Sequence, residues 1–172
     1  MSKTITTFTA QLVTFESALP FKDVVTRLDK ALNKEGSKQI VPRMGASTSR
    51  TEIENLINGI CKDNDFLYFL ELNHHKWLNI FEGNDNPAAV LYIIGNPLIA
   101  QTIIKHDIRA AYNIPPRLLV LEKPDRSGTK LVYHLPSSVM ALTDNPELKA
   151  AVAILDQKLE DFVKSVIIPD NN

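Results

Sequence analysis

Apolar residues in this chain follow strand-like or helix-like spacing in well-separated stretches. Near the N-terminus, Phe8, Ala10 and Leu12 alternate with polar residues, which predicts a strand within Thr4–Glu16. Short apolar runs bounded by turn residues predict four further strands, at Phe66–Leu72, Ala88–Ile94, Arg117–Lys123 and Thr129–Leu135. The Ala88–Ile94 run does not alternate, so we expect it inside the sheet rather than at its edge. Pro124–Gly128 predicts a hairpin turn between the last two strands.

Helical spacing occurs in four other stretches. It predicts helices over about Phe21–Lys34, Ser49–Lys62, Asn96–Asp107 and Pro146–Val166. Ser49 with Glu52 three residues later forms a capping-box pattern, and Asn96 followed by Pro97 fits a cap and a first-turn proline. In the last helix Leu155 and Leu159 lie one turn apart on the apolar seam, so we expect both to be buried.

Two stretches are ambiguous. Ser37–Ser49 has Ile40 and Val41 among polar residues, and we interpret it as a short strand or a loop. Trp77–Phe81 is predicted to continue the preceding strand or to form the second arm of a hairpin across Asn73–Lys76. The elements together predict an α+β fold, a single domain over residues 1–168 in which a sheet of mainly antiparallel strands packs against helices. Residues 169–172 are expected to form a disordered tail.

Composition narrows the class of protein. The 172 residues are 44% hydrophobic and 23% charged, with a net charge of −1, as in ordinary globular domains and unlike the basic domains that bind nucleic acid. The single cysteine, Cys61, rules out an internal disulfide and favours a reducing compartment. No apolar run approaches the roughly 20 residues of a membrane span, and the N-terminus lacks the apolar core of a signal peptide. We therefore expect a cytoplasmic protein with neither membrane nor nucleic acid as partner.

The second half of the chain resembles a known family. The order of the Gly95–Ala100 motif, the hairpin, Pro136-Ser137-Ser138, Asn145-Pro146 and a long amphipathic helix is similar to that of the bacterial and fungal family called domain of unknown function 302. The likeness is best over Ala88–Ile167. Glu71–Trp77 looks more like fungal members, and Arg43–Lys62 looks like an insertion relative to the compact bacterial form. The resemblance implies an α+β sandwich and a homodimer, and it supplies no catalytic residue.

The segment Glu71–Trp77 carries the main candidates for chemistry. On a regular strand, Glu71, Asn73 and Trp77 would share one face, and His74 would lie on the other, otherwise apolar face. One interpretation places His74 in a pocket as a general acid or base assisted by Glu71, with Asn73 and Trp77 contacting a ligand. His74 and Trp77 can share a pocket only if the chain turns within Asn73–Lys76. The other interpretation is a polar turn with solvated histidines.

Three other residues have both a functional and a structural interpretation. Tyr133 either assists catalysis or is a buried tyrosine with a satisfied hydroxyl group. Arg109 follows a helix end and either contacts solvent or binds a ligand carboxylate through its planar fork. Cys61 is expected to be a small buried residue rather than a nucleophile.

The motifs of the common cofactor enzymes are missing from the sequence. It contains no phosphate loop, dinucleotide fingerprint, zinc spacing or nucleophile elbow, so we expect neither a cofactor nor a metal. Three functions remain open. The first is a homodimeric small-molecule-binding domain, the second a cofactor-free enzyme of the isomerase or lyase type that uses His74, and the third a structural or partner-binding module.

Overall fold

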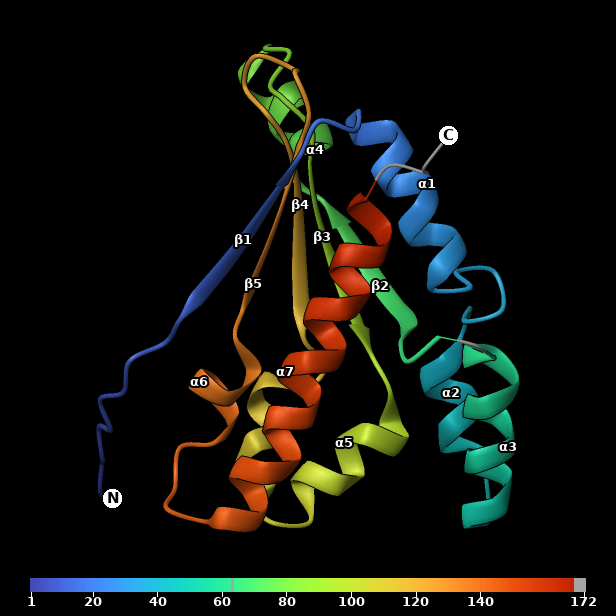
Figure 1. The fold of residues 1–172 in the computed structure, drawn as a ribbon, viewed down its shortest axis with the longest axis vertical. Helices are drawn as coiled ribbons and strands as arrows, with labels where there is room; N and C mark the ends of the chain where they lie inside the picture. Colours follow the sequence, from blue (N-terminus) through green and yellow to red (C-terminus); the bar gives the residue numbers. More distant parts are fainter. Residues whose placement is uncertain (63, 169–172) are drawn as a thin grey trace.

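One antiparallel sheet forms the centre of the fold. The computed structural model describes residues 1–62 and 64–168. The five strands are β1 (Leu12–Ser17), β2 (Leu67–Asn73), β3 (Ala89–Gly95), β4 (Arg117–Glu122) and β5 (Thr129–His134), and they lie in the order β1-β5-β4-β3-β2 (Figure 1). Every neighbouring pair is antiparallel. The predicted α+β fold is confirmed, and β3 lies inside the sheet as its unbroken apolar run indicates.

Helices cover one face of the sheet and surround its ends. Their bounds are α1 (Phe21–Ala31), α2 (Ile40–Gly45), α3 (Arg50–Cys61), α4 (His74–Glu82), α5 (Pro97–Ile104), a 3-10 helix (Ile108–Asn113), α6 (Pro136–Met140) and α7 (Pro146–Ile167). In Figure 1 the long α7 lies across the sheet, α1 lies beside the C-terminal half of α7, and α2 and α3 flank the outer side of β2.

The main core lies between α7, α1 and the inner face of the sheet. Alternate residues of β3, Val90, Tyr92 and Ile94, are buried in this cluster, as a strand with one face covered by helices requires. Leu155 and Leu159 of α7 are buried in the same cluster, which confirms the predicted apolar seam. A smaller cluster of Ile40, Ile57, Ile60, Cys61 and Leu67 holds α2 and α3 against β2.

The predicted caps are present. The Ser49 hydroxyl oxygen accepts a hydrogen bond from the backbone N–H of Glu52 at 3.2 Å, and α3 begins at the next residue. The Asn145 side chain, for which no cap was predicted, likewise accepts a hydrogen bond from the N–H of Leu148 at the start of α7. Each cap satisfies a backbone donor that would otherwise have no partner inside its helix, and this is why both helices begin where the sequence indicates.

The interpretation of Trp77–Phe81 as a strand is wrong, because the chain leaves β2 after Asn73 and enters α4 at once. Trp77, Leu78 and Phe81 also fit helical spacing, and Gly83 ends the helix in the left-handed conformation with φ of 67°. Gly83, which follows this helix-compatible spacing, was the sequence signal that favoured a helix over a strand.

Three smaller differences also have physical reasons. Ser37–Ser49 contains the short helix α2, whose Pro42 lies in the first turn, where its missing N–H costs no hydrogen bond. The strand predicted within Thr4–Glu16 begins only at Leu12, because its partner β5 ends at His134 opposite that residue. The 3-10 helix and α6 are short elements that the apolar pattern did not predict. The predicted tail at 169–172 lies outside the described residues.

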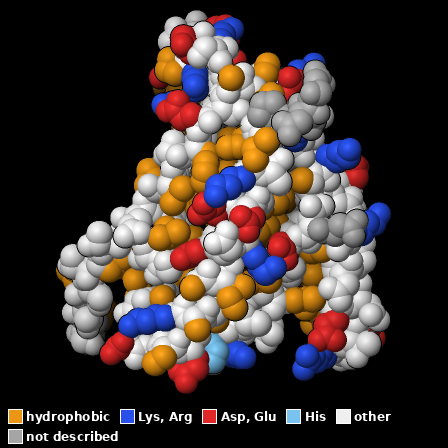
Figure 2. Space-filling model, viewed as in Figure 1, with side chains coloured by type: hydrophobic (Ala, Val, Ile, Leu, Met, Phe, Trp, Pro, Cys, Tyr) orange, Lys and Arg blue, Asp and Glu red, His pale blue; other side chains and the backbone are white. Residues whose placement is uncertain are grey.

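The second face of the sheet carries an apolar row. The strand registers place Leu72 beside Leu91, Leu91 beside Leu119, and Leu119 beside Val132. These side chains alternate with the buried ones of the inner face, and all are half-buried or exposed. On the helix-covered side, basic, acidic and apolar side chains are intermingled rather than gathered by sign (Figure 2).

Candidate functional site

A cavity of about 550 Å³ lies at the end of the sheet where β3 runs into α5. This volume is within the range of about 300–1,000 Å³ that is typical of small-molecule sites. One wall is α5, and the others come from β2, the segment after the 3-10 helix, α2 and α7. Its apolar side chains are Met44, Phe66, Phe69, Pro97, Ile99, Ala100, Ile103, Ile104, Ile114, Pro115, Pro116 and Leu155.

The local sequence explains why α5 begins at this position. The Asn96 side chain accepts a hydrogen bond from the N–H of Leu98 at 2.9 Å, and Pro97 is the first residue of the helix. Gly95 allows the strand to pass close to the next segment, since a Cβ there would lie 3.0 Å from Cβ of Pro115. The Asn-Pro motif therefore acts as a cap, as its sequence indicates, and places α5 as one wall of the cavity.

The cavity has few polar groups to offer. Asn96 is already engaged, because its amide also donates to the backbone oxygen of Asp65 at 3.0 Å. Gln101 on α5 and Lys105 immediately after it are the other polar side chains of the lining, and both are exposed. A lining of this kind suits an apolar ligand, since each Å² of apolar surface removed from water contributes roughly 25 cal/mol.

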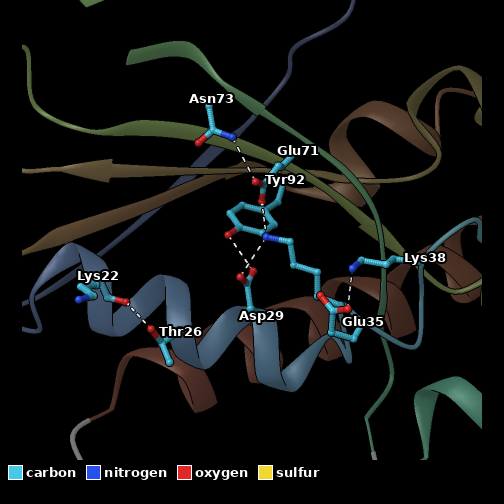
Figure 3. A network of polar contacts seen from close by, with 9 residues as sticks. Lys22, Thr26, Asp29, Glu35, Lys38, Glu71, Asn73 and Tyr92 are labelled. Carbon is cyan, nitrogen blue, oxygen red and sulfur yellow. Dashed lines mark hydrogen bonds and ion pairs between the residues drawn. The ribbon is translucent and has the colours of Figure 1, made fainter. Parts of the chain in front are cut away.

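A second candidate is a half-buried polar cluster between α1 and the sheet, formed by Asp29, Lys34, Glu71, Asn73 and Tyr92. The Lys34 ammonium lies 2.7 Å from Glu71 Oε2 and 3.0 Å from Asp29 Oδ2. The Tyr92 hydroxyl donates to Asp29 at 3.0 Å, and the Asn73 amide donates to Glu71 at 3.1 Å. Figure 3 shows Asp29 of α1 pointing toward Glu71 of β2 and Tyr92 of β3, with Asn73 of β2 beside Glu71.

These contacts fix the protonation states of the polar cluster. Burial alone would lower the pKa of Lys34, but its hydrogen bonds to Glu71 and Asp29 outweigh this effect and raise it. Burial alone would raise the pKa of Glu71, yet the Lys34 ammonium lowers it below its usual value. Burial and the Asp29 charge raise the pKa of Tyr92. Near neutral pH Lys34 is therefore charged, Glu71 is ionised and Tyr92 is a neutral phenol.

The polar cluster includes two of the residues predicted as site residues, Glu71 and Asn73. The Lys34 ammonium also faces the Tyr68 and Tyr92 rings, at 5.3 and 5.7 Å from their centroids, in cation–π contacts. Each charged group already has opposite charges or donors beside it, and no described cavity opens onto the cluster. This arrangement is typical of a structural network.

The histidine segment lies at the other end of β3. His74 begins α4, and Trp77 follows three residues later on a neighbouring position of the same helix, with 57% of its surface exposed. The chain therefore turns within Asn73–Lys76, which is the condition for His74 and Trp77 to share a pocket. His75 Nδ1 lies 3.1 Å from the backbone oxygen of Ala89. Neither His74 nor Trp77 lines the apolar cavity, and the role of His74 as an acid or base stays a prediction.

The other predicted residues are also away from the cavity. Tyr133 is buried in the core, and its hydroxyl has no hydrogen-bond partner among the described residues. Burial, with the charges of Glu160 and Asp156, raises the pKa of that hydroxyl to about 12. Arg109 is paired with Asp107, whose pKa it lowers to about 2, mainly through the hydrogen bonds of its guanidinium group. Cys61 is buried, and burial raises the pKa of its thiol to about 11.

Sequence reasoning missed the cavity itself. Its walls come from segments that are far apart in the chain, such as Met44, Phe69, Ile104 and Leu155. The one local signal was the Asn96-Pro97 cap, which marks where α5 begins but not what lies beside it. Lys34, Asp29 and Tyr92 were missed in the polar cluster for the same reason, since they meet Glu71 only through the fold.

Comparison with known proteins identifies the family. The family model described as "Domain of unknown function DUF302" matches residues 45–166. Among solved structures, the chain resembles an uncharacterised conserved DUF302 protein from Bacillus stearothermophilus, with a TM-score of 0.63 and 15% sequence identity over 91% of this chain and 98% of that one. None of the curated proteins matches. Across residues 1–62 and 64–168, no helix is both long enough and apolar enough to cross a membrane.

Proposed function

The chain belongs to the DUF302 family, and we propose that it is a small-molecule-binding domain whose ligand is held in the apolar cavity beside α5. One observation carries this proposal: about 550 Å³ of space enclosed by aliphatic, aromatic and proline side chains. The cavity is open to solvent, so part of its apolar lining faces water. An apolar ligand would cover this lining and remove its own surface from water.

Filling the cavity tests the proposal. Ala100 lines the cavity on α5, so Ala100→Trp would place an indole group in the space that a ligand needs. Ala153 is exposed on α7 and does not line the cavity, so Ala153→Trp is the matched control. We expect Nile red, a neutral apolar dye, to bind the unmodified protein and the control with enhanced fluorescence and to lose most of this binding in Ala100→Trp.

The outcome is read together with thermal unfolding, which shows whether both variants remain folded. Equal binding of the dye by a folded Ala100→Trp variant would contradict the proposal, because the dye would then lie elsewhere. Failure of the unmodified protein to bind the dye or the aliphatic compounds named below would also contradict it.

We also propose that the protein is a homodimer in which a second copy covers the open face of the sheet. This proposal is supported by the apolar row of Leu72, Leu91, Leu119 and Val132, which crosses four strands without a charged side chain. A face of this kind can pack on its own copy about a two-fold axis, since the same patch serves both partners.

A charge in this face tests the dimer. Leu72 and Leu142 are each 47% exposed, but Leu142 lies outside the sheet, in the segment before α7. We expect light scattering to give a dimer mass for the unmodified protein and for Leu142→Lys, and a monomer mass for Leu72→Lys. A monomer mass for the unmodified protein over a wide concentration range would contradict this proposal and leave the cavity proposal in place.

Two further parts of the prediction are retained as proposals. The similarity of Glu71–Trp77 to fungal members supports a fungal-type member of the family. A single buried thiol, Cys61, supports a reducing and therefore cytoplasmic location.

A further inference from the structure

We infer that the ligand of this cavity is a long-chain carboxylate, with its head group beside Lys105 at the edge of the cavity and its hydrocarbon chain inside. The inference rests on the proposed function and names the class of ligand. It follows from the contrast between the one charged side chain of the lining and the apolar character of the rest.

Lys105 is the charged residue among those that line the cavity. It follows the last residue of α5, and its side chain is exposed. Within the part of the chain that the structure describes, its ammonium group makes no ion pair, whereas Lys34, Lys149 and Lys158 each pair with a carboxylate. Its apolar stem can cover the lining while the ammonium group stays at the edge.

The nearest acidic group in the sequence is already occupied. Asp107 accepts hydrogen bonds from the Arg109 guanidinium at 3.0 and 2.8 Å and from the Arg109 backbone N–H at 2.9 Å. Its charge is therefore compensated by Arg109, which leaves the Lys105 ammonium group available to an anion from outside the chain.

The polar groups of the lining fit a small head group with one negative charge. An ammonium group is a compact charge with three donors, and the Gln101 amide, one turn earlier on α5, adds two more. A carboxylate has two oxygens that such donors can satisfy. The Asn96 amide is engaged by the backbone of Asp65, so it adds nothing for a larger polar head group.

The aliphatic side chains of the lining indicate the chemical nature of the ligand's buried part. Ile99, Ile103, Ile104, Ile114 and Leu155 present only aliphatic groups to the cavity. A polar group on the buried part of a ligand would lose its hydrogen bonds to water without gaining others, which weakens binding. An unsubstituted hydrocarbon chain avoids this cost.

The test compares two compounds that differ only in their head groups. Dodecanoate and 1-dodecanol are each titrated against bound Nile red, below their aggregation limits and at constant ionic strength. The proteins are the unmodified chain, Lys105→Met, and the control Lys76→Met, in which the replaced lysine is exposed on α4 and does not line the cavity. We expect dodecanoate to bind the unmodified chain and the control about tenfold more tightly than 1-dodecanol, as one charge-assisted hydrogen bond allows. In Lys105→Met this preference should be lost, so that the two compounds bind with equal affinity.

The outcomes separate the inference from the function on which it rests. Equal affinities for the two compounds in the unmodified chain, or a preference for dodecanoate that survives in Lys105→Met, would overturn the carboxylate assignment while the binding function stands. An equal loss of the preference in Lys76→Met would also overturn it, since the effect would then be one of net charge. If neither compound nor the dye binds, the proposed function and the inference both fail.

Discussion

The apolar cavity and the polar cluster differ in whether their groups already have partners. In the polar cluster the charged groups already have partners. The Lys34 ammonium lies 3.0 Å from the Asp29 carboxylate and 2.7 Å from that of Glu71, and Tyr92 and Asn73 donate further hydrogen bonds to these carboxylates. The cavity has a volume of about 550 Å³, and Lys105 is the one charged residue of its lining. Both regions use β2, which contributes Glu71 to the first and Phe69 to the second.

This difference separates stabilisation from binding. A half-buried ion cluster whose members satisfy one another is part of the fold, and removing one member leaves the others without partners. The apolar cavity contains no such network, and a ligand that covers its lining would bind through the burial of apolar surface. We therefore expect substitutions in the polar cluster to change the free energy of unfolding and substitutions in the cavity to change binding.

The largest effect is expected on α7, where Leu159 is fully buried and Leu155, one turn earlier, lines the cavity. Leu159→Ala should cost about 2–5 kcal/mol of unfolding free energy, as deletion of a packed leucine side chain does. Leu155→Ala should cost less, because part of its surface already faces empty space. Urea denaturation of the two variants checks this order, and a greater loss for Leu155→Ala would mean that the cavity is closed in solution.

A smaller loss is expected when the cation of the polar cluster is removed. Lys34→Met leaves Asp29 and Glu71 facing each other without a counter-charge and should cost about 1–3 kcal/mol. Lys38→Met, which removes a lysine from an exposed pair with Glu35, should change stability little. Urea denaturation measures both variants. Lys34→Met should bind Nile red as the unmodified protein does. A loss of dye binding by the folded variant would show that the polar cluster contributes to binding, contrary to the division of roles described above.

The smallest effect is expected on the pH dependence of stability, through the protonation of Glu71. The pKa of Glu71 is lower in the folded protein than its ordinary value of 4.5, so the stability it adds is fully present above about pH 4.5 and is lost as the pH falls through the lowered value. Glu71→Gln should therefore show a weaker loss of stability between pH 5 and pH 2 than the unmodified protein. Urea midpoints across this range measure the difference, and parallel curves would show that Glu71 does not titrate as the contacts require.

The sequence predicted the elements whose signals are local. Capping by Ser49 and Asn96, the hairpin after β4 and the seam of α7 each depend on residues close together in the chain. The segment after β2 was misinterpreted because Trp77, Leu78 and Phe81 suit a strand as well as a helix, and only Gly83 distinguishes them.

The candidate sites were less accessible to sequence reasoning. Glu71 was selected for its neighbours His74 and Trp77, but its partner Lys34 is 37 residues away. The cavity depends on how α5, β2 and α7 meet, and the Asn96-Pro97 cap indicates only where α5 begins. A histidine suggests chemistry in a sequence, whereas isoleucines that line a cavity have the same pattern as isoleucines in a core.

The position of α5 has a consequence for how the family could diversify. Ile99, Ala100 and Ile104 project from one eight-residue helix that is held at its start by Asn96 and Pro97. Under the proposed function, exchanges at these three positions would change the shape of the cavity while the five-stranded sheet and the polar cluster stay intact. Substitutions within two helical turns would then be enough to change which compound the cavity selects.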